Sequence, residues 1–374
     1  MKPVGSPLEP SRLIPGSDSA GMKVLLVGTG THAIPPVGYG AVERILYEYG
    51  QALSSSGHSA RILNEVHETG SLGEYRFAFH LRSLLRREEY DVLHASTPVV
   101  ANRLAGAGLP FIYTSHSRHW FWRQNWRHRW GFRLERRAVR RAAAVVALTP
   151  AVEAAMHATL PPAHPAPVRV IPYGVNANDY GPAWELRTGR RALGVGLVHP
   201  LKDWETAAAA LKGTGISLRI AGPIPDPVYA QRVRVAGDAV ELLGEVDERR
   251  LRSLYAESDL LVHPSQVEVL PRAVLEAMAS ALPVVGSAVV APLFAGGGAG
   301  LAAPSGTCGD ELVRFVRSSA ERLAADDSLR RAMGAAGRAL AKEHYAWDRV
   351  VAAHIDLYRE AAAGVPSRLG SPRG

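Results

Sequence analysis

The chain has 374 residues, which is enough for two domains of ordinary size, and 47% of them are apolar. This globular composition includes no apolar run near the ~20 residues that would span a bilayer. The single cysteine, Cys308, excludes an internal disulfide and a cysteine-rich metal site, and the net charge of +8 hints at acidic partners.

Residues 1–21 are rich in proline, serine and glycine and are predicted to form a disordered tail. Short apolar segments then alternate with helical patterns, which is typical of a parallel sheet covered on both faces. A helix is expected from about Val42 to Leu53. The expected strands are 23–28, 91–95, 111–115, 144–149 and 167–176. We therefore expect a Rossmann-like domain over 22–175.

The stretch that ends near Gly189 is rich in proline, glycine and asparagine and is expected to be a linker. The alternating pattern then restarts, and Asp203 is predicted to cap a helix that ends at Leu211. The expected strands are 190–198, 217–223, 240–246, 259–265 and 283–287. A second Rossmann-like domain is expected over 176–345.

An amphipathic helix over 346–362 could pack back on the N-terminal domain, and residues 363–374 are expected to be a second disordered tail. The fold class is α/β. Two similar halves joined by one linker predict mainly parallel sheets that face a central cleft, with ligands bound beyond the carboxyl ends of the strands.

Two glutamates flank a predicted helix start in the segment EVLPRAVLE, residues 268–276. Proline is favoured in the first turn of a helix, so Pro271 places Glu268 in the preceding loop and Glu276 more than one turn inside the helix. The free N–H groups of a first turn can bind a phosphate. A carboxylate can accept two hydrogen bonds from the diol of a ribose or a sugar. These features suit a nucleotide-linked sugar, although the spacing is also typical of surface acids near a helix start.

The segment HPSQVEVLPRAVLEAMASALPVVGS, residues 263–287, resembles the Glu-x7-Glu signature of family 4 retaining glycosyltransferases of the GT-B fold. The segments GLVHPLKDWETAAAAL, LRIAGP, ELLGEV and DLLVHPS precede it in the order that this family shows. In the first half, PPVGYGAVER, DVLHAS and VRVIPYGVN resemble the family as well. The resemblance extends over residues 22–360 and implies sugar transfer from a nucleotide-diphosphate donor to a hydroxyl. It also implies that the domain 22–175 lies on the acceptor side and that the domain 176–345 binds the nucleotide-sugar donor.

On this resemblance, Glu276 would bind the ribose of the donor and Glu268 would lie near the donor sugar. Lys202 stands where the family has a lysine that binds the diphosphate, so it would offset charge on the leaving group. The family's arginine, five residues earlier, is Leu197 here. Arg272, beside the helix start, could compensate for that missing charge.

The loop PPVGYGA, residues 35–41, resembles the glycine loop of the family. Gly38 and Gly40 would let backbone amides approach the donor phosphates or the reacting sugar. His116 ends a predicted strand at the family's position for a histidine beside the transferred sugar. We expect His94, which also lies at a strand end, to be structural rather than functional.

One further departure lies after the strand 283–287, where the family usually has a Gly-Gly-x-Pro-Glu run. Here residues 289–293 read VVAPL, and Val289 and Val290 have more bulk and less backbone freedom than glycine. The glycines of the following segment AGGGAG, residues 295–300, could restore flexibility. The change leaves the identity of the donor open.

Residues 117–141 contain four of the seven tryptophans, and nine arginines lie between Arg118 and Arg141 with Glu135 as the single acid. A spacing of four residues predicts one helical stripe, flanked by Arg129 and Arg133 and made of Trp122, Trp126, Trp130 and Leu134. The stripe could face the core with a solvated basic back. It could instead border the acceptor cleft or lie on an anionic membrane. Nucleic-acid binding has no support elsewhere in the chain.

These observations predict a retaining glycosyltransferase of hexosyltransferase type without a cofactor. No Asp-x-Asp occurs in the chain, so metal independence is expected. The co-substrate would be a UDP-, GDP- or ADP-linked sugar, and the acceptor a glycan, a lipid-linked saccharide or a small metabolite. We expect a cytoplasmic enzyme of cell-envelope or polysaccharide biosynthesis that could contact the inner face of the membrane.

Two alternatives remain open. One is a catalytically degenerate homologue that binds a nucleotide, an anionic glycan or a membrane, which the departures at Leu197, Val289 and Val290 favour. The other, less favoured, is a glycoside hydrolase, in which paired carboxyls lie ~5–5.5 Å apart. A hydrolase has no diphosphate to hold, so Lys202 and the phosphate-suited helix start argue against it.

Overall fold

The computed structural model describes residues 21–36, 38, 40–121, 129–161, 166–294 and 298–363. The two tails predicted to be disordered lie almost wholly outside these residues, as do Trp122 and Trp126. By its contacts, the chain forms two compact units. The first comprises the chain up to Tyr173 and the segment from Trp347 onward, and the second extends from Gly174 to Ala346. No helix among the described residues is long and apolar enough to cross a membrane.

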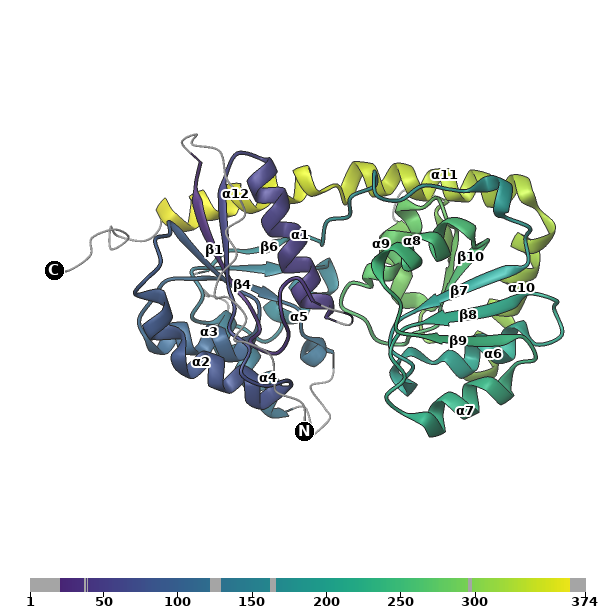
Figure 1. Cartoon of the computed structure of the whole chain (residues 1–374), viewed down its shortest axis with the longest axis horizontal. Helices are drawn as coiled ribbons and strands as arrows, with labels where there is room; N and C mark the ends of the chain where they lie inside the picture. The colour runs from purple at the N-terminus through teal and green to yellow at the C-terminus, as the bar shows by residue number, and fades with distance from the viewer. Residues whose placement is uncertain are drawn as a thin grey trace, which may run out of the picture. The chain divides into compact units, whose positions relative to one another are not determined.

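Each unit contains a six-stranded sheet in which every strand pair is parallel, with helices on both faces (Figure 1). The α/β prediction of two Rossmann-like, mainly parallel sheets is therefore confirmed.

The first sheet has the strand order β2-β1-β3-β4-β5-β6. Its strands are β1 Lys23–Val27, β2 Ser59–Leu63, β3 Val92–Ala95, β4 Ile112–Ser115, β5 Ala144–Ala147 and β6 Val168–Val170. The helices of this unit are α1 Ala41–Ser55, α2 Ser71–Leu85, α3 Pro98–Gly106, α4 Arg129–Val139, α5 Pro150–His157 and α12 Trp347–Ala363, with the 3-10 turn η1 Arg118–Trp120. The predicted strands contain β1, β3, β4, β5 and β6, whereas β2 was not predicted.

Helices α1 and α12 pack together over one face of the first sheet (Figure 1). Leu46 of α1 and Val350 of α12 belong to the same apolar cluster as Val24 and Leu26 of β1. The hydroxyls of Tyr49 and Tyr358 lie 2.8 Å apart and join the two helices inside this core. Residues that are far apart in the chain thus complete one unit.

The second sheet has the strand order β12-β11-β10-β7-β8-β9. Its strands are β7 Arg191–Val195, β8 Ser217–Ala221, β9 Val240–Gly244, β10 Leu260–His263, β11 Val284–Gly286 and β12 Gly300–Ala302. Its helices are α6 Trp204–Leu211, α7 Pro227–Ala236, α8 Glu248–Glu257, α9 Arg272–Ala279, α10 Gly309–Ala325 and α11 Asp327–His344, with 3-10 turns η3 Trp184–Leu186, η4 Pro200–Lys202 and η5 Ala288–Phe294. Helix α6 ends at Leu211, as predicted, and Asp203 directly precedes it in a left-handed conformation.

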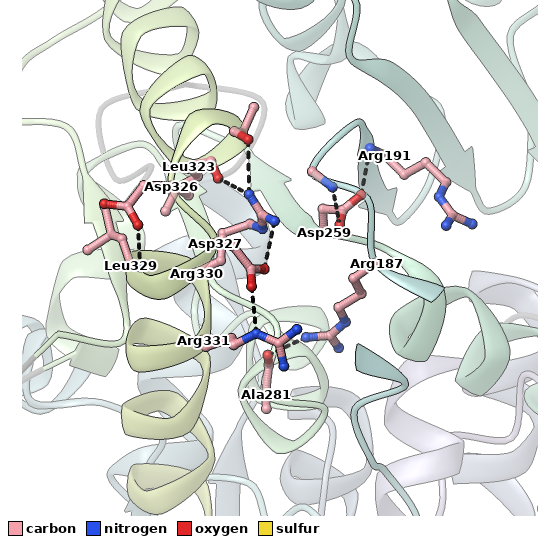
Figure 2. A network of polar contacts seen from close by, with 12 residues as sticks. Arg187, Arg191, Asp259, Ala281, Leu323, Asp326, Asp327, Leu329, Arg330 and Arg331 are labelled. Carbon is pink, nitrogen blue, oxygen red and sulfur yellow. Dashed lines mark hydrogen bonds and ion pairs between the residues drawn. The ribbon is translucent and has the colours of Figure 1, made fainter. Parts of the chain in front are cut away.

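Arg187 joins the segment that enters the second sheet to the C-terminal end of α9 (Figure 2). Its buried guanidinium donates hydrogen bonds to the carbonyl oxygens of Ala281 at 2.7 Å, Ser280 at 2.8 Å and Ala256 at 3.0 Å. The last carbonyls of a helix have no partner inside it, so Arg187 satisfies groups that would otherwise be buried unpaired. Burial lowers the pKa of Arg187 to about 10. The stretch predicted as a linker is therefore packed at this residue.

Asp259 holds the start of β7 from the side of β10. Its carboxylate accepts hydrogen bonds from the backbone N–H groups of Gly189 at 2.7 Å and Arg191 at 2.9 Å. In the same region (Figure 2), Arg330 and Arg331 donate to the two carboxylate oxygens of Asp327 at 2.8 and 2.7 Å. These contacts fix the amino-end side of the second sheet, which leaves its carboxyl-end loops as the place for a ligand.

Candidate functional site

Close backbone packing shapes the carboxyl end of the second sheet. Gly196 follows β7 and Gly222 follows β8, with φ values of 143° and 154°. A Cβ on Gly222 would lie 2.1 Å from the carbonyl oxygen of Gly196, and a Cβ on Gly196 would lie 3.3 Å from Cε of Lys202. Only glycine fits where these loops and the lysine side chain come together. The two glycines thus make room for Lys202 beside the strand ends.

Lys202 and Glu268 form an ion pair at this edge. Nζ of Lys202 lies 2.5 Å from Oε1 of Glu268, and the two side chains are 20% and 12% exposed. Nε2 of His263, the last residue of β10, lies 3.5 Å from the same carboxylate oxygen. The structure therefore brings together two predicted residues and a buried histidine to which no role was assigned.

The charges of this group are set by burial and by the ion pair. Burial raises the pKa of the Glu268 carboxyl, but His263 and Lys202 favour its charged form more strongly and hold the pKa well below its usual range. Burial lowers the pKa of His263, and Glu268 offsets only part of this effect. At neutral pH the group holds an ionised carboxylate beside an ammonium and a neutral imidazole.

Glu276 lies inside α9 and is buried, so it is not a surface acid. Its carboxylate accepts a hydrogen bond from the Tyr255 hydroxyl at 2.9 Å and one from Nε of Arg272 at 2.6 Å. Pro271 is the residue before the helix rather than a member of its first turn, and α9 begins at Arg272. Glu268 precedes the helix and Glu276 lies more than one turn inside it, as predicted.

Leu197 and Val290, which depart from the family pattern, both make contacts inside the second unit. The carbonyl oxygen of Leu197 accepts a hydrogen bond from the indole N–H of Trp204 at 2.9 Å. Val290 is fully buried in η5, and a Cβ on Gly286 would lie 2.8 Å from its side chain. Val290 therefore belongs to the core of the unit. Arg272, the proposed compensating charge, lies at the helix start but is paired with Glu276.

In the first unit, the glycine loop leads from β1 into α1. Gly38 is exposed with a φ of 89°, and Gly40 is buried directly before the helix. A Cβ on Gly40 would lie 2.7 Å from the Pro36 side chain. Glu43, in the first turn of α1, is buried and accepts hydrogen bonds from the hydroxyls of Thr29 at 2.5 Å and Thr31 at 3.0 Å. Glu43 thus links the residues after β1 to the first turn of α1.

The two histidines at strand ends of the first unit differ in their surroundings. Nδ1 of His116 lies 2.6 Å from the Tyr173 hydroxyl, and burial lowers the pKa of His116 to about 4. His94 is buried, with its ring nitrogens 2.5 Å from the Tyr358 hydroxyl and 2.6 Å from the Thr114 hydroxyl. His94 therefore connects the sheet to α12, which agrees with the structural role expected for it.

Where the structure describes the basic, aromatic segment, it forms the 3-10 turn η1 and helix α4. Trp130 is 64% exposed, and Arg129 and Arg133 are exposed beside it. Of the two orientations left open for the stripe, the core-facing one is wrong for Trp130, because the buried residues of α4 are Glu135, Ala138 and Val139.

Glu135, the single acid of the segment, is fully buried and accepts hydrogen bonds from the Tyr113 hydroxyl at 2.9 Å and from the Ser115 hydroxyl. It ties α4 to the end of β4.

Two family models match the chain. Residues 42–179 match the model described as Glycosyltransferase Family 4, and residues 196–319 match the one described as Glycosyl transferases group 1. The two matches follow one another and together take in well over half of the chain. The chain belongs to the family 4 glycosyltransferases of the group 1 type.

Similar proteins agree with this family. A curated relative from Kineococcus radiotolerans, named D-inositol 3-phosphate glycosyltransferase, is 29% identical over 244 residues, which are 56% of this chain and 55% of the relative. The chain thus spans about half the length of that relative.

Two solved structures share the fold. Sucrose-phosphate synthase from Thermosynechococcus elongatus has a TM-score of 0.77 at 19% identity, over 92% of this chain and 100% of the other. The Anabaena protein HepE, in complex with UDP and glucose, has a TM-score of 0.71 at 18% identity, over 91% and 100%. At these identities the likeness shows the GT-B fold.

Sequence reasoning missed three residues that contact the proposed site of this family 4 glycosyltransferase. His263 could have been found, because it lies near the end of the predicted strand 259–265, five residues before Glu268. Tyr255 and Gly196 carried no such signal. Tyr255 lies on another helix, and the need for glycine at 196 arises from its φ of 143° and from the Lys202 side chain packed against it, which only the fold reveals.

Proposed function

We propose that this chain is a retaining glycosyltransferase that moves a hexose from a nucleoside-diphosphate sugar to a hydroxyl of an acceptor. The observation that supports this most is the ion pair of Lys202 with Glu268, 2.5 Å apart at the carboxyl ends of the strands. A partly exposed ammonium at that edge suits a diphosphate, and the start of α9 adds the positive end of a helix dipole. The name of the curated relative and the ligands of HepE support the same class of reaction.

The donor would use the second unit in three ways. The Glu276 carboxylate would accept hydrogen bonds from the ribose hydroxyls, held in place by Tyr255 and Arg272. The Lys202 ammonium would give up part of its ion pair with Glu268 and would neutralise charge on the diphosphate instead. The ionised Glu268 would then accept hydrogen bonds from hydroxyls of the transferred sugar. This division of roles needs no metal to bridge the diphosphate.

In the transfer step, the bond between the anomeric carbon and the diphosphate oxygen breaks as the acceptor oxygen bonds to that carbon from the same face. The acceptor proton passes to the leaving diphosphate. The sugar becomes oxocarbenium-like, so catalysis depends on position and charge stabilisation rather than on a strong base. Lys202 would lower the barrier because negative charge grows on the diphosphate beside it.

The first unit would bind the acceptor. Gly38 and Gly40 would place backbone amides near the reacting sugar, and His116 would stay neutral, because its pKa is about 4. The exposed Trp130, Arg129 and Arg133 of α4 would contact an anionic glycan, a lipid-linked acceptor or the membrane surface that carries it.

A second candidate is a homologue that binds the nucleotide without turnover. The core packing of Val290 and the pairing of Arg272 with Glu276 favour it, because both reduce the groups available to a donor sugar.

The test measures nucleoside-diphosphate release from UDP-, GDP- and ADP-linked glucose and mannose, with mixed hydroxyl acceptors and with EDTA. We expect turnover of one donor and its loss in Lys202→Ala, with the exposed Lys212→Ala as the matched control. Binding without turnover would favour the non-catalytic homologue. Release of free sugar from ordinary glycosides without nucleotide would favour a hydrolase.

A further inference from the structure

Three side chains of kinds that can bind a metal lie together on the first unit, apart from every residue used above. Glu65 and His67 belong to the loop after β2, and His80 lies in α2. One ligand atom from each of the three lies within 4.8 Å of the others. Nε2 of His67 is 3.3 Å from a carboxylate oxygen of Glu65 and 3.3 Å from Nδ1 of His80.

The two 3.3 Å distances from Nε2 of His67 match the separation between two ligand atoms bound to one metal ion. Ligand atoms at 2.0–2.1 Å from a tetrahedral zinc ion are about 3.3 Å apart. Hydrogen bonding explains this arrangement less well, because Nε2 of His67 carries at most one hydrogen and cannot donate fully to both neighbours. A cation between the three atoms would satisfy their lone pairs together.

We propose that Glu65, His67 and His80 bind a divalent transition-metal ion of the zinc class. Two imidazole nitrogens and one carboxylate oxygen are ligands that zinc takes in proteins, with water completing the sphere. The side chains of His67 and Glu65 are 31% and 41% exposed, so an ion can enter from solvent. An open site of three ligands should bind less tightly than a closed site of four.

The neighbours of the group hold its rings in place. The ring of His80 packs edge-on against that of His67, at a centroid distance of 5.1 Å, and against Phe79 at 5.6 Å. Arg103 of the neighbouring helix α3 places its guanidinium 5.7 Å from the centroid of the Phe79 ring. Fewer free rotamers mean a smaller entropic cost when the ion binds.

The ion would stabilise the segment that directly follows β1. Asn64, directly before Glu65, accepts a hydrogen bond from the Gly30 N–H at 2.9 Å and donates one to the His32 carbonyl at 3.0 Å. Phe77 of α2 packs on Gly30, where a Cβ would lie 2.4 Å from the Phe77 Cβ. A metal that joins the loop 64–67 to α2 would therefore clamp the segment after β1 between two elements. Its role would be structural, and it would not take part in the transfer step.

The test is calorimetric titration of Zn²⁺ into the full chain, without a polyhistidine tag and after treatment with EDTA and its removal. The variants are His67→Ala, His80→Ala and Glu65→Gln, and the matched control is His157→Ala, an exposed histidine of the same unit. We expect one fewer bound equivalent in each histidine variant, at least about tenfold weaker binding in Glu65→Gln, and parent behaviour in the control.

Thermal unfolding gives an independent readout. Zn²⁺ should raise the unfolding midpoint of the parent and of His157→Ala by a few degrees, because a ligand that binds only the folded state stabilises it. The histidine variants should show no such rise, although their midpoints without metal should equal that of the parent. Equal stoichiometry and equal midpoint shifts in parent and variants would overturn the proposal, as would a parent that binds no Zn²⁺.

Discussion

Nζ of Lys202 lies 2.5 Å from Oε1 of Glu268, and Nε2 of the buried His263 lies 3.5 Å from the same oxygen. Without a ligand, the carboxylate therefore neutralises the ammonium that we assign to the donor diphosphate. A donor must compete with Glu268 for Lys202, and its diphosphate can do so because it carries more charge and more acceptor oxygens.

The first prediction concerns this ion pair. Lys202→Ala should lower kcat/KM for the donor by about 100- to 1000-fold, because the charge on the leaving diphosphate loses its partner. Most of the loss should appear in kcat, since the interaction strengthens as the bond breaks. Steady-state kinetics with Lys212→Ala as the control would measure it. A variant with the kinetics of the parent would show that Lys202 is not at the diphosphate.

The second prediction concerns the ribose. Glu276→Gln should weaken nucleotide binding by about 10- to 100-fold, because a charge-assisted hydrogen bond is worth ~1.5–3 kcal/mol. Tyr255→Phe should weaken it less, because Arg272 still orients the carboxylate. Titration of both variants with the nucleotide would compare the two effects. A larger effect of Tyr255→Phe would mean that the tyrosine, rather than the carboxylate, contacts the nucleotide.

The third prediction concerns pH. Burial raises the pKa of Glu135 to about 7, against the opposing hydrogen bonds from Ser115, Tyr113 and Trp120. A raised pKa in the fold favours the protonated form. The contribution of Glu135 to stability is therefore complete below its ordinary pKa near 4.5 and is lost as the pH rises to about 7. The loss is on the order of 3 kcal/mol.

Urea unfolding of the parent and Glu135→Gln at several pH values would measure this contribution. The unfolding free energy of the parent minus that of Glu135→Gln should fall as the pH rises from 4.5 to 7.5. The exposed control Glu343→Gln should follow the parent at every pH. The histidines with lowered pKa values, among them His116 and His354, make contributions to stability that rise with pH. These contributions are the same in the parent and the variant, so they cancel when the two unfolding free energies are subtracted. Parallel curves for parent and Glu135→Gln would show that this carboxyl does not titrate in that range.

The fourth prediction concerns stability. Arg187→Met should destabilise the second unit by about 3 kcal/mol or more, because the carbonyls of Ser280, Ala281 and Ala256 would stay buried without their donor. Arg190→Ala, an exposed neighbour, should change the unfolding free energy by less than about 0.5 kcal/mol. Chemical unfolding monitored by circular dichroism would compare them. Equal small effects would mean that water replaces the guanidinium.

Much of the fold could be predicted because the central strands are short, apolar and buried on both faces, as in KVLLV and LLVH. The two strands that were not predicted, β2 and β12, both lie at sheet edges. Their sequences, SARIL and GLA, contain no run of three apolar residues, so they lack the short apolar run that indicates the central strands.

The candidate site also contains residues that the sequence predicts and residues that it does not. Glu268, Glu276 and Lys202 could be proposed because the family pattern marks them, and Glu268 could be placed before the helix from Pro271 alone. Their partners could not, because the pairing of Tyr255 with Glu276 depends on how α8 packs against α9. The exposure of Trp130 was likewise not visible in a spacing that suits a buried stripe equally well.

The central claim is that the second unit binds a nucleoside-diphosphate sugar through Glu276 and Lys202 without a metal. Calorimetric titration of the purified chain with UDP, GDP, ADP and their common sugar conjugates, in EDTA, tests it most directly. The account predicts clear binding of one nucleotide by the parent and by Lys212→Ala, and much weaker binding by Glu276→Ala. A folded parent that binds none of them, or a Glu276→Ala variant that binds like the parent, would contradict it.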